Sequence, residues 1–154
     1  MPRIPGSLLL AAFLLLGGAA RAQNAPPHAW LFGTWTGGIF PAPSHMTAQE
    51  CLAQPTVIFT RDVVLRSTLT ETAYAQRVIE TVRGTPNGTE FRFTASLLPA
   101  PGSGMVGLGE TPQPSFGCAS PNILSVQREG KGEDTIAFPG CTDFPYPLVR
   151  CPAH

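Results

Sequence analysis

Four cysteines, Cys51, Cys118, Cys141 and Cys151, carry the most definite chemistry in this sequence of 154 residues. No two of them are spaced as C-x-x-C, the pattern typical of zinc ligation, thiol redox chemistry or haem attachment. An even number of cysteines without such a motif is typical of a protein that forms disulfides in an oxidising compartment. The sequence therefore predicts two disulfide bonds and no metal or redox role for the thiols.

One pairing of these cysteines is favoured by the hairpin that we expect around Lys131. Cys118 precedes Lys131 and Cys141 follows it at a nearly equal distance along the chain. Such positions meet across an antiparallel pair of strands, which favours Cys118–Cys141 and leaves Cys51 to pair with Cys151. Four cysteines allow three connectivities, and the other two remain open at this stage.

The remaining reactive side chains give little sign of catalysis. The chain has three scattered histidines, His28, His45 and His154, with no H-E-x-x-H motif and no G-x-S-x-G motif. Ser44 precedes His45, but a catalytic triad is defined by geometry and not by adjacency. A hydrolase with His45 as base is therefore the weakest alternative. A metal site built from His45, Glu50 and Asp62 lacks any supporting spacing, so we expect no catalytic residue, no metal and no cofactor.

The N-terminus has the layout of a secretory signal peptide. An arginine precedes an apolar run over residues 8–20, and small residues lie at the expected cleavage site between Ala22 and Gln23. The apolar run is too short to cross a bilayer as a helix. We expect residues 1–22 to be removed, leaving a flexible leader over 23–29 and a periplasmic or secreted protein with no stable membrane insertion.

The charge of the mature chain excludes some classes of partner. The sequence has ten basic and ten acidic residues. Two of the basic ones, Arg3 and Arg21, lie in the signal peptide, which leaves eight against ten. Nucleic-acid binding requires a basic face that neutralises phosphates, and attachment to anionic lipid requires clustered lysine and arginine. We expect neither.

Residues 30–154 read as a single β domain. Seven or eight short strands are expected among segments that are rich in β-branched and aromatic residues and separated by Gly, Pro and Asn: 30–40, 56–60, 63–69, 75–83, 89–97, 123–128, 134–138 and 146–150. The second and third segments are either two strands of a hairpin or one strand with a bulge. Residues 70–83 also have helical spacing, but we favour a strand from about Gln76. This pattern predicts an all-β, antiparallel, disulfide-stabilised fold, and we favour a small barrel over the alternative, a β-sandwich. A capping box of Thr47 and Glu50 predicts a short helix, and residues 99–121 form a long Pro/Gly-rich loop.

The clearest hairpin surrounds the residues GTPNG. We expect a five-residue loop over 84–88, with positive φ angles at Asn87 and Gly88. That loop would place Arg83 opposite Thr89, Glu80 opposite Arg92 and Ile79 opposite Phe93. The arginines of the strand-rich middle (Arg61, Arg66, Arg77, Arg83 and Arg92) are expected on the solvent side, as cross-strand partners of Glu71, Glu80 and Glu90.

The segment LFGTWTGGIF contains a Gly-x-Trp, Gly33 to Trp35, at the start of the first expected strand. In this motif, in its length and in its export signal, the chain resembles secreted barrels of the lipocalin type, although its cysteines and the 99–121 loop depart from that pattern. The resemblance implies that Trp35 closes the base of the barrel and that Arg150, near the last strand, stacks on it. Small bacterial secreted protease inhibitors of similar architecture begin in the same way.

Together these features predict an exported, non-catalytic binding protein of the cell envelope. Its partner would be a small apolar ligand, because small closed barrels enclose a site for one ligand, or an envelope protein. A second hypothesis is a secreted inhibitor or envelope-assembly protein that acts through loop 99–121.

Overall fold

The computed structural model describes residues 25–43, 45–67, 74–95, 115–130 and 134–153. The expected signal peptide with Ala22 and Gln23, as well as Ser44, Lys131, His154 and residues 99–114 of the long loop, lie outside this part of the chain. Within the described residues, no helix has both the length and the apolar character needed to cross a membrane.

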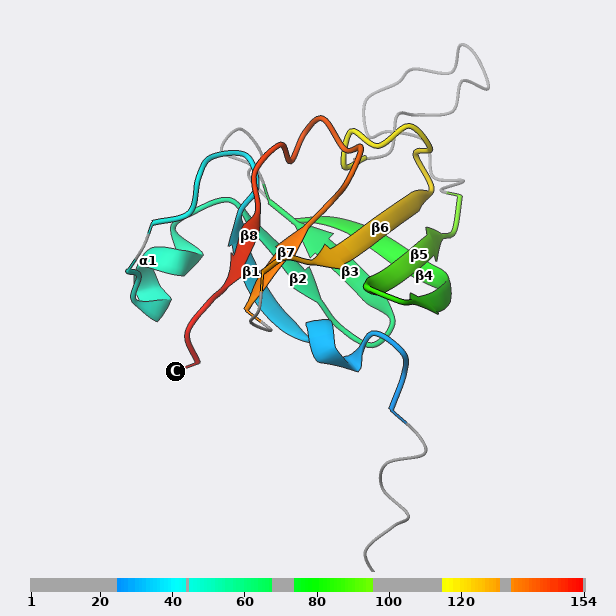
Figure 1. The fold of residues 1–154 in the computed structure, drawn as a ribbon, viewed down its shortest axis with the longest axis horizontal. Helices are drawn as coiled ribbons and strands as arrows, with labels where there is room; N and C mark the ends of the chain where they lie inside the picture. Colours follow the sequence, from blue (N-terminus) through cyan, green and yellow to red (C-terminus); the bar gives the residue numbers. More distant parts are fainter. Residues whose placement is uncertain (1–24, 44, 68–73, 96–114, 131–133, 154) are drawn as a thin grey trace, which may run out of the picture.

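The described residues form a closed, eight-stranded antiparallel barrel in which each strand pairs with the next along the chain (Figure 1). Pairing of Trp35 with Arg150 joins the first strand to the last and closes the sheet, so the barrel is confirmed and the sandwich is not. The strands are β1 (Gly33–Gly37), β2 (Thr56–Phe59), β3 (Val63–Arg66), β4 (Ala75–Thr85), β5 (Gly88–Phe93), β6 (Ile123–Arg128), β7 (Thr135–Ala137) and β8 (Leu148–Arg150).

Alternation along the strands separates the core from the outer wall. In β5, for example, Thr89, Phe91 and Phe93 are buried while Arg92 is exposed, as expected for a strand with one face toward a core. The buried apolar residues form one cluster that includes Trp35, Phe59 and Leu124. A single hydrophobic core inside one barrel therefore accounts for the fold.

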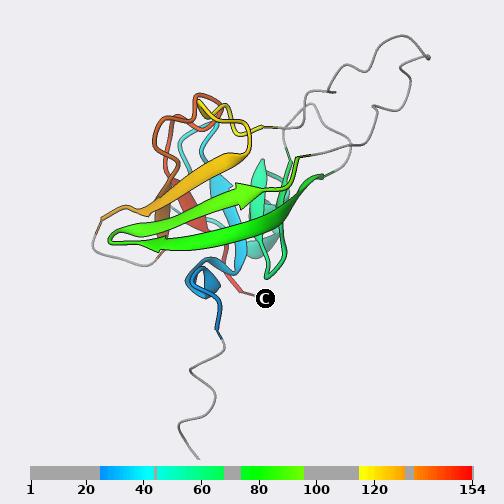
Figure 2. The same cartoon turned by 90° about the vertical axis from the view of Figure 1, so that its right-hand side faces the viewer.

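The connections at the two ends of the barrel differ in length. Strand β2 is joined to β3, β4 to β5 and β6 to β7 at one end of the barrel, which we call the turn end. Strand β1 is joined to β2, β3 to β4, β5 to β6 and β7 to β8 at the other, the loop end. In Figure 2 the β4–β5 hairpin crosses the front of the barrel, with the N-terminal segment below it at the turn end.

A 3-10 helix, η2 (Ala29–Leu31), covers the turn end. The sequence predicts a strand from Trp30, but the strand begins at Gly33, whose φ of 122° is accessible to glycine and strained for other residues. The turn at Gly33 leaves Leu31 fully buried at the base of the core. The Trp30 Nε1 group donates a hydrogen bond of 3.0 Å to Thr89 Oγ1, which fixes the helix against β5.

The predicted short helix is present as α1 (Ala48–Leu52), with Thr47 as its N-cap. Both halves of the capping box form, because Thr47 Oγ1 accepts from the Glu50 amide and the Glu50 carboxylate accepts from the Thr47 amide. The Thr47 amide and the Thr47 hydroxyl both donate to the Glu50 carboxylate, and these two hydrogen bonds lower the pKa of Glu50. The helix places Cys51 against the C-terminal segment.

Two disulfides join the connections to the barrel. Cys51 pairs with Cys151, and Cys118 pairs with Cys141, which is the pairing favoured by the sequence. No cysteine is free. The first bond ties α1 to the end of β8, and the second joins the β5–β6 and β7–β8 connections at the loop end. Both bonds indicate an oxidising, extracytoplasmic environment.

The expectation for the β4–β5 hairpin is wrong in its loop and in most of its register. The loop has two residues, Pro86 and Asn87, and Arg83 lies opposite Glu90 with an ion pair of 2.9 Å. A bulge at Glu80 absorbs one residue, so Thr81 faces Arg92 while Ile79 still faces Phe93. No described residue other than glycine has a positive φ, and neither does Gly88.

Gly88 is required by a close approach and not by its φ angle. A Cβ added there would lie 1.9 Å from the Val126 carbonyl oxygen of β6. We expect Gly88→Ala to lower the free energy of unfolding by about 1 to 3 kcal/mol, the range for overpacking. Gly84→Ala in the same hairpin is the matched control, because its Cβ would meet its nearest atom, on Pro27, at 4.0 Å. Urea melts that show equal stability for the two variants would contradict this account.

Candidate functional site

The turn end of the barrel is held by a stack of Arg150 on Trp35. The guanidinium carbon lies 4.2 Å from the centroid of the indole ring, the arrangement that the lipocalin resemblance implies. Its two terminal nitrogens donate to the carbonyls of Phe32, at 2.8 Å, and Trp30, at 2.6 Å. The remaining nitrogen lies 3.3 Å from the Asp134 carboxylate. The donors of Arg150 thus fasten the barrel to η2, and the stack is a structural closure.

Side chains fill the barrel above this stack. The rings of Phe59, Phe91 and Phe93 are each at most 2% exposed, and successive centroids lie 5.5 and 6.2 Å apart. Phe116 and Phe144 continue the cluster toward the loop end with a separation of 5.6 Å. Larger barrels enclose an open cavity, whereas small ones are filled by side chains or hold one ligand. Here the phenylalanine rings occupy the space that an enclosed ligand would need.

Two arginines enter the interior at the loop end, contrary to the expectation of solvent-facing side chains. Arg66 is 8% exposed and Arg77 is 1% exposed. Burial and the nearby charge of Arg66 lower the pKa of Arg77. The alternation of side chains along β3 could have revealed that Arg66 is buried. Arg66 follows the buried Val64 by two residues, so both side chains point to the same side of the strand.

These arginines hold the segment 115–122 over the loop end. Arg66 donates to the Ser115 carbonyl and lies 3.5 Å from the Asp143 carboxylate. Arg77 donates to the Pro121 carbonyl at 3.0 Å and to the Asn122 amide oxygen at 2.8 Å. Arg77 also lies 4.8 Å from the centroid of the Phe93 ring. Hydrogen bonds from charged groups are among the stronger ones in proteins, so this segment is firmly fixed to the barrel wall.

The candidate catalytic and metal-binding residues do not come together. His45 is exposed and forms no hydrogen bond with the described residues. His28 is 2% exposed at the turn end, where its Nε2 lies 3.1 Å from the Thr60 carbonyl oxygen. Across the ranges that the structure describes, no three His, Cys, Asp or Glu side chains are grouped to hold a metal. His45, Glu50 and Asp62, the set considered and disfavoured in the sequence analysis, are not grouped in this way.

Exposed aromatic side chains lie on the loop-end connections. Phe40 is 53% exposed and Tyr146 is 44% exposed. Their connections are paired, because the Gly38 amide donates to the Pro147 carbonyl and the Tyr146 amide donates to the Gly38 carbonyl. A pocket of about 330 Å³ opens beside Tyr146. A second pocket, of about 320 Å³, lies near the turn end between Phe32, Leu52 and the C-terminal segment.

No protein-family model, curated protein or solved structure matches this chain. Arguments about function therefore rest on the geometry of the two barrel ends and the outer wall.

Proposed function

We propose that this protein is an exported, non-catalytic binding protein that recognises an envelope protein through the connections at its loop end. The observation that carries the proposal is the contrast between a filled interior and exposed aromatic side chains at that end. Because side chains fill the barrel, an enclosed apolar ligand is disfavoured, and we place binding on the outer surface. Connections on a rigid scaffold are common places for binding residues.

The loop-end surface also has the properties of a preorganised binding site. The Cys118–Cys141 bond and the clamps from Arg66 and Arg77 fix two of its connections before any partner arrives. Preorganisation lowers the entropy cost of binding. Tyrosine and phenylalanine supply large contact areas and are enriched at protein interfaces. Inhibition of an envelope enzyme, which the sequence suggests for loop 99–121, is one form of such binding, and the described residues 115–121 of that loop lie at the same end of the barrel.

Export is tested by the N-terminus of the product. Expressed in a bacterial host with a secretion pathway, the protein is expected in the periplasm or the medium with Gln23 as its first residue, since residues 1–22 have the order of a signal peptide. Edman sequencing or intact mass measures this. Accumulation of a cytoplasmic chain that begins at Met1 would refute export.

Partner binding is tested by site-specific photo-crosslinking in the native host. A benzophenone amino acid at Tyr146 or Phe40 is expected to give a covalent adduct with a protein, because both side chains are exposed at the loop end. The same group at Arg61, which is exposed at the turn end, is the control and should give none. Adduct mass spectrometry identifies the partner. Equal adducts at all three positions, or none at any, would count against the proposal.

A further inference from the structure

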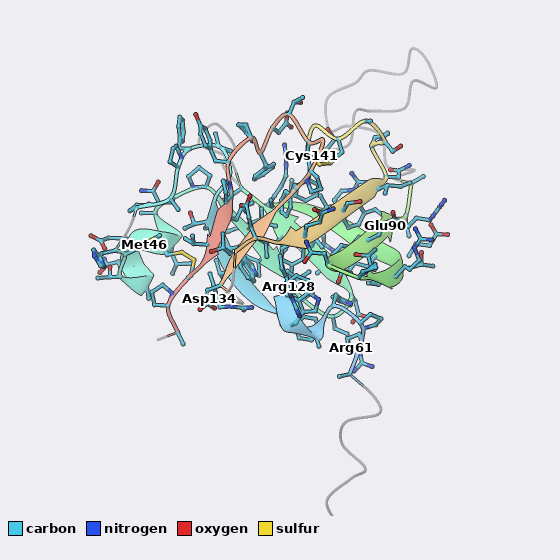
Figure 3. All side chains as sticks on the ribbon, viewed as in Figure 1. Met46, Arg61, Glu90, Arg128, Asp134 and Cys141 are labelled. Carbon is cyan, nitrogen blue, oxygen red and sulfur yellow. A yellow bond between two sulfur atoms is a disulfide. The ribbon has the colours of Figure 1, made fainter. Side chains whose placement is uncertain are left out.

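The pocket beside Tyr146 lies on the outer face of the barrel, between the end of β6, strand β7 and the 138–147 connection. Its walls include Ala137 of β7 and the three prolines Pro139, Pro145 and Pro147. Figure 3 shows Cys141 of this connection at the opposite end of the barrel from Arg128, the last residue of β6. The pocket is therefore a groove along the outer wall that ends at Glu129.

The register places the Glu129 carboxylate on the wall of this groove. Gln127 lies opposite Ala137 in the β6–β7 pair, so the two side chains share one face of the sheet. Ala137 lines the pocket and alternates with the buried Ile136, which makes this face the outer one. The Glu129 amide donates to the Thr135 carbonyl, so the ladder continues one residue beyond β6. By alternation, Glu129 points to the same side as Gln127.

Glu129 has no charged partner in the described part of the chain, where it forms neither an ion pair nor a side-chain hydrogen bond. Its neighbour Arg128 stacks on Trp30 at 4.3 Å, and the nearby Asp134 is paired with Arg150. Among the described residues, no lysine, arginine or histidine lines the pocket. The groove thus combines apolar walls, an exposed phenol ring and one carboxylate that has no charged partner among those residues.

We infer that this groove binds a lysine or arginine side chain of the protein partner. Such a side chain has an apolar stem and a charged head, and the groove offers matching features in the same order. The stem would lie against Pro145, Tyr146 and Pro147, and the head would reach Glu129. A single ion pair of this kind contributes more to specificity than to affinity. The inference rests on the proposed function, since it names the chemistry of the partner.

Backbone NMR titrations with small probes test the groove without knowledge of the partner. The probes are Nα-acetyl-lysine amide, Nα-acetyl-arginine amide and the uncharged Nα-acetyl-norleucine amide. The cationic probes are expected to bind weakly and to shift the amide signals of Gly140, Thr142 and Tyr146. The norleucine probe should bind about fivefold more weakly, because it lacks the charge that pairs with Glu129.

Variants of two exposed carboxylates sharpen the test. Glu129→Gln is expected to weaken the cationic probes about fivefold and to leave norleucine unchanged. Glu80→Gln, at an exposed position on β4, is the matched control and should change neither. Raising the salt concentration with the unaltered protein should weaken only the cationic probes. Equal binding of norleucine, no effect of Glu129→Gln, shifts confined to another surface, or no binding of the cationic probes would each overturn the inference.

The two proposals fail in different ways. Cationic probes that bind with the expected dependence on Glu129, together with no adduct from Tyr146, would support the groove and refute loop-end recognition of a protein. An adduct from Tyr146 with the same yield in the Glu129→Gln variant, together with no probe binding, would support partner recognition and refute the groove. A reduced adduct yield in Glu129→Gln but not in Glu80→Gln supports both.

Discussion

Replacement of Trp35 with alanine is expected to lower the free energy of unfolding by about 3 to 5 kcal/mol, the range for truncation of large aromatic side chains in a core. Trp35 is fully buried, and its Nε1 donates a hydrogen bond of 2.8 Å to the Leu31 carbonyl. The substitution removes the ring beneath Arg150 and leaves the Leu31 carbonyl without its donor. Urea melts followed by circular dichroism measure the change.

Trp30→Ala is the matched control for this prediction. Trp30 is only partly buried on the outside of the core, so its loss should cost less than the loss of Trp35. A cost below about 1 kcal/mol for Trp35→Ala would contradict the role of this residue as a core plug. A double-mutant cycle of Trp35→Leu with Arg150→Met removes the aromatic ring and the guanidinium in turn and so isolates the stack, whose coupling we expect at about 0.5 to 2 kcal/mol.

The sequence predicts the barrel strands well because their period is simple. Segments such as VIF in β2 and FRF in β5 alternate between core and wall residues, and glycine or proline separates them. The capping box at Thr47 is equally local, since its two hydrogen bonds involve residues three positions apart. Structural features that depend only on residues close in sequence can therefore be predicted from the sequence.

The features that the sequence did not predict depend on contacts between distant segments. The two-residue loop at Pro86 and Asn87 is combined with a bulge at Glu80 that restores the pairing of Ile79 with Phe93, and local residues do not reveal a bulge. The burial of Arg66 depends on Ser115 and Asp143, which lie far along the chain. Charged residues are almost always exposed unless they are paired, so composition alone favours the wrong face for Arg66.

The candidate site has the same dependence on distant contacts. The groove at Tyr146 exists because the 138–147 connection lies beside the end of β6, and Glu129 becomes part of it through the β6–β7 register. Neither residue belongs to a motif. The recognisable motifs, the Gly-x-Trp and the cysteines, stabilise the barrel. The surface that we propose for binding is instead formed by residues without a motif, which come together only when the chain folds.

The two disulfides should differ in their effect on stability because they close loops of different length. Cys51 and Cys151 are separated by 100 positions and Cys118 and Cys141 by 23. Chain-entropy estimates give about 4.7 kcal/mol for the longer loop and about 3.4 kcal/mol for the shorter one. We therefore expect the double variant Cys51→Ser with Cys151→Ser to be less stable than the double variant Cys118→Ser with Cys141→Ser.

Denaturant melts of both double variants, beside the oxidised parent protein, measure this order. The prediction has a local counterpart, because the Cys118–Cys141 bond lies at the loop end while the other bond ties α1 to β8. Loss of the Cys118–Cys141 bond should reduce partner crosslinking from Tyr146 more than loss of the Cys51–Cys151 bond does, although it costs less stability. The reason is that it releases the connection that carries Tyr146. The reverse order of stabilities, or non-reducing peptide maps that join Cys51 to Cys118, would contradict the disulfide assignment and the entropic argument built on it.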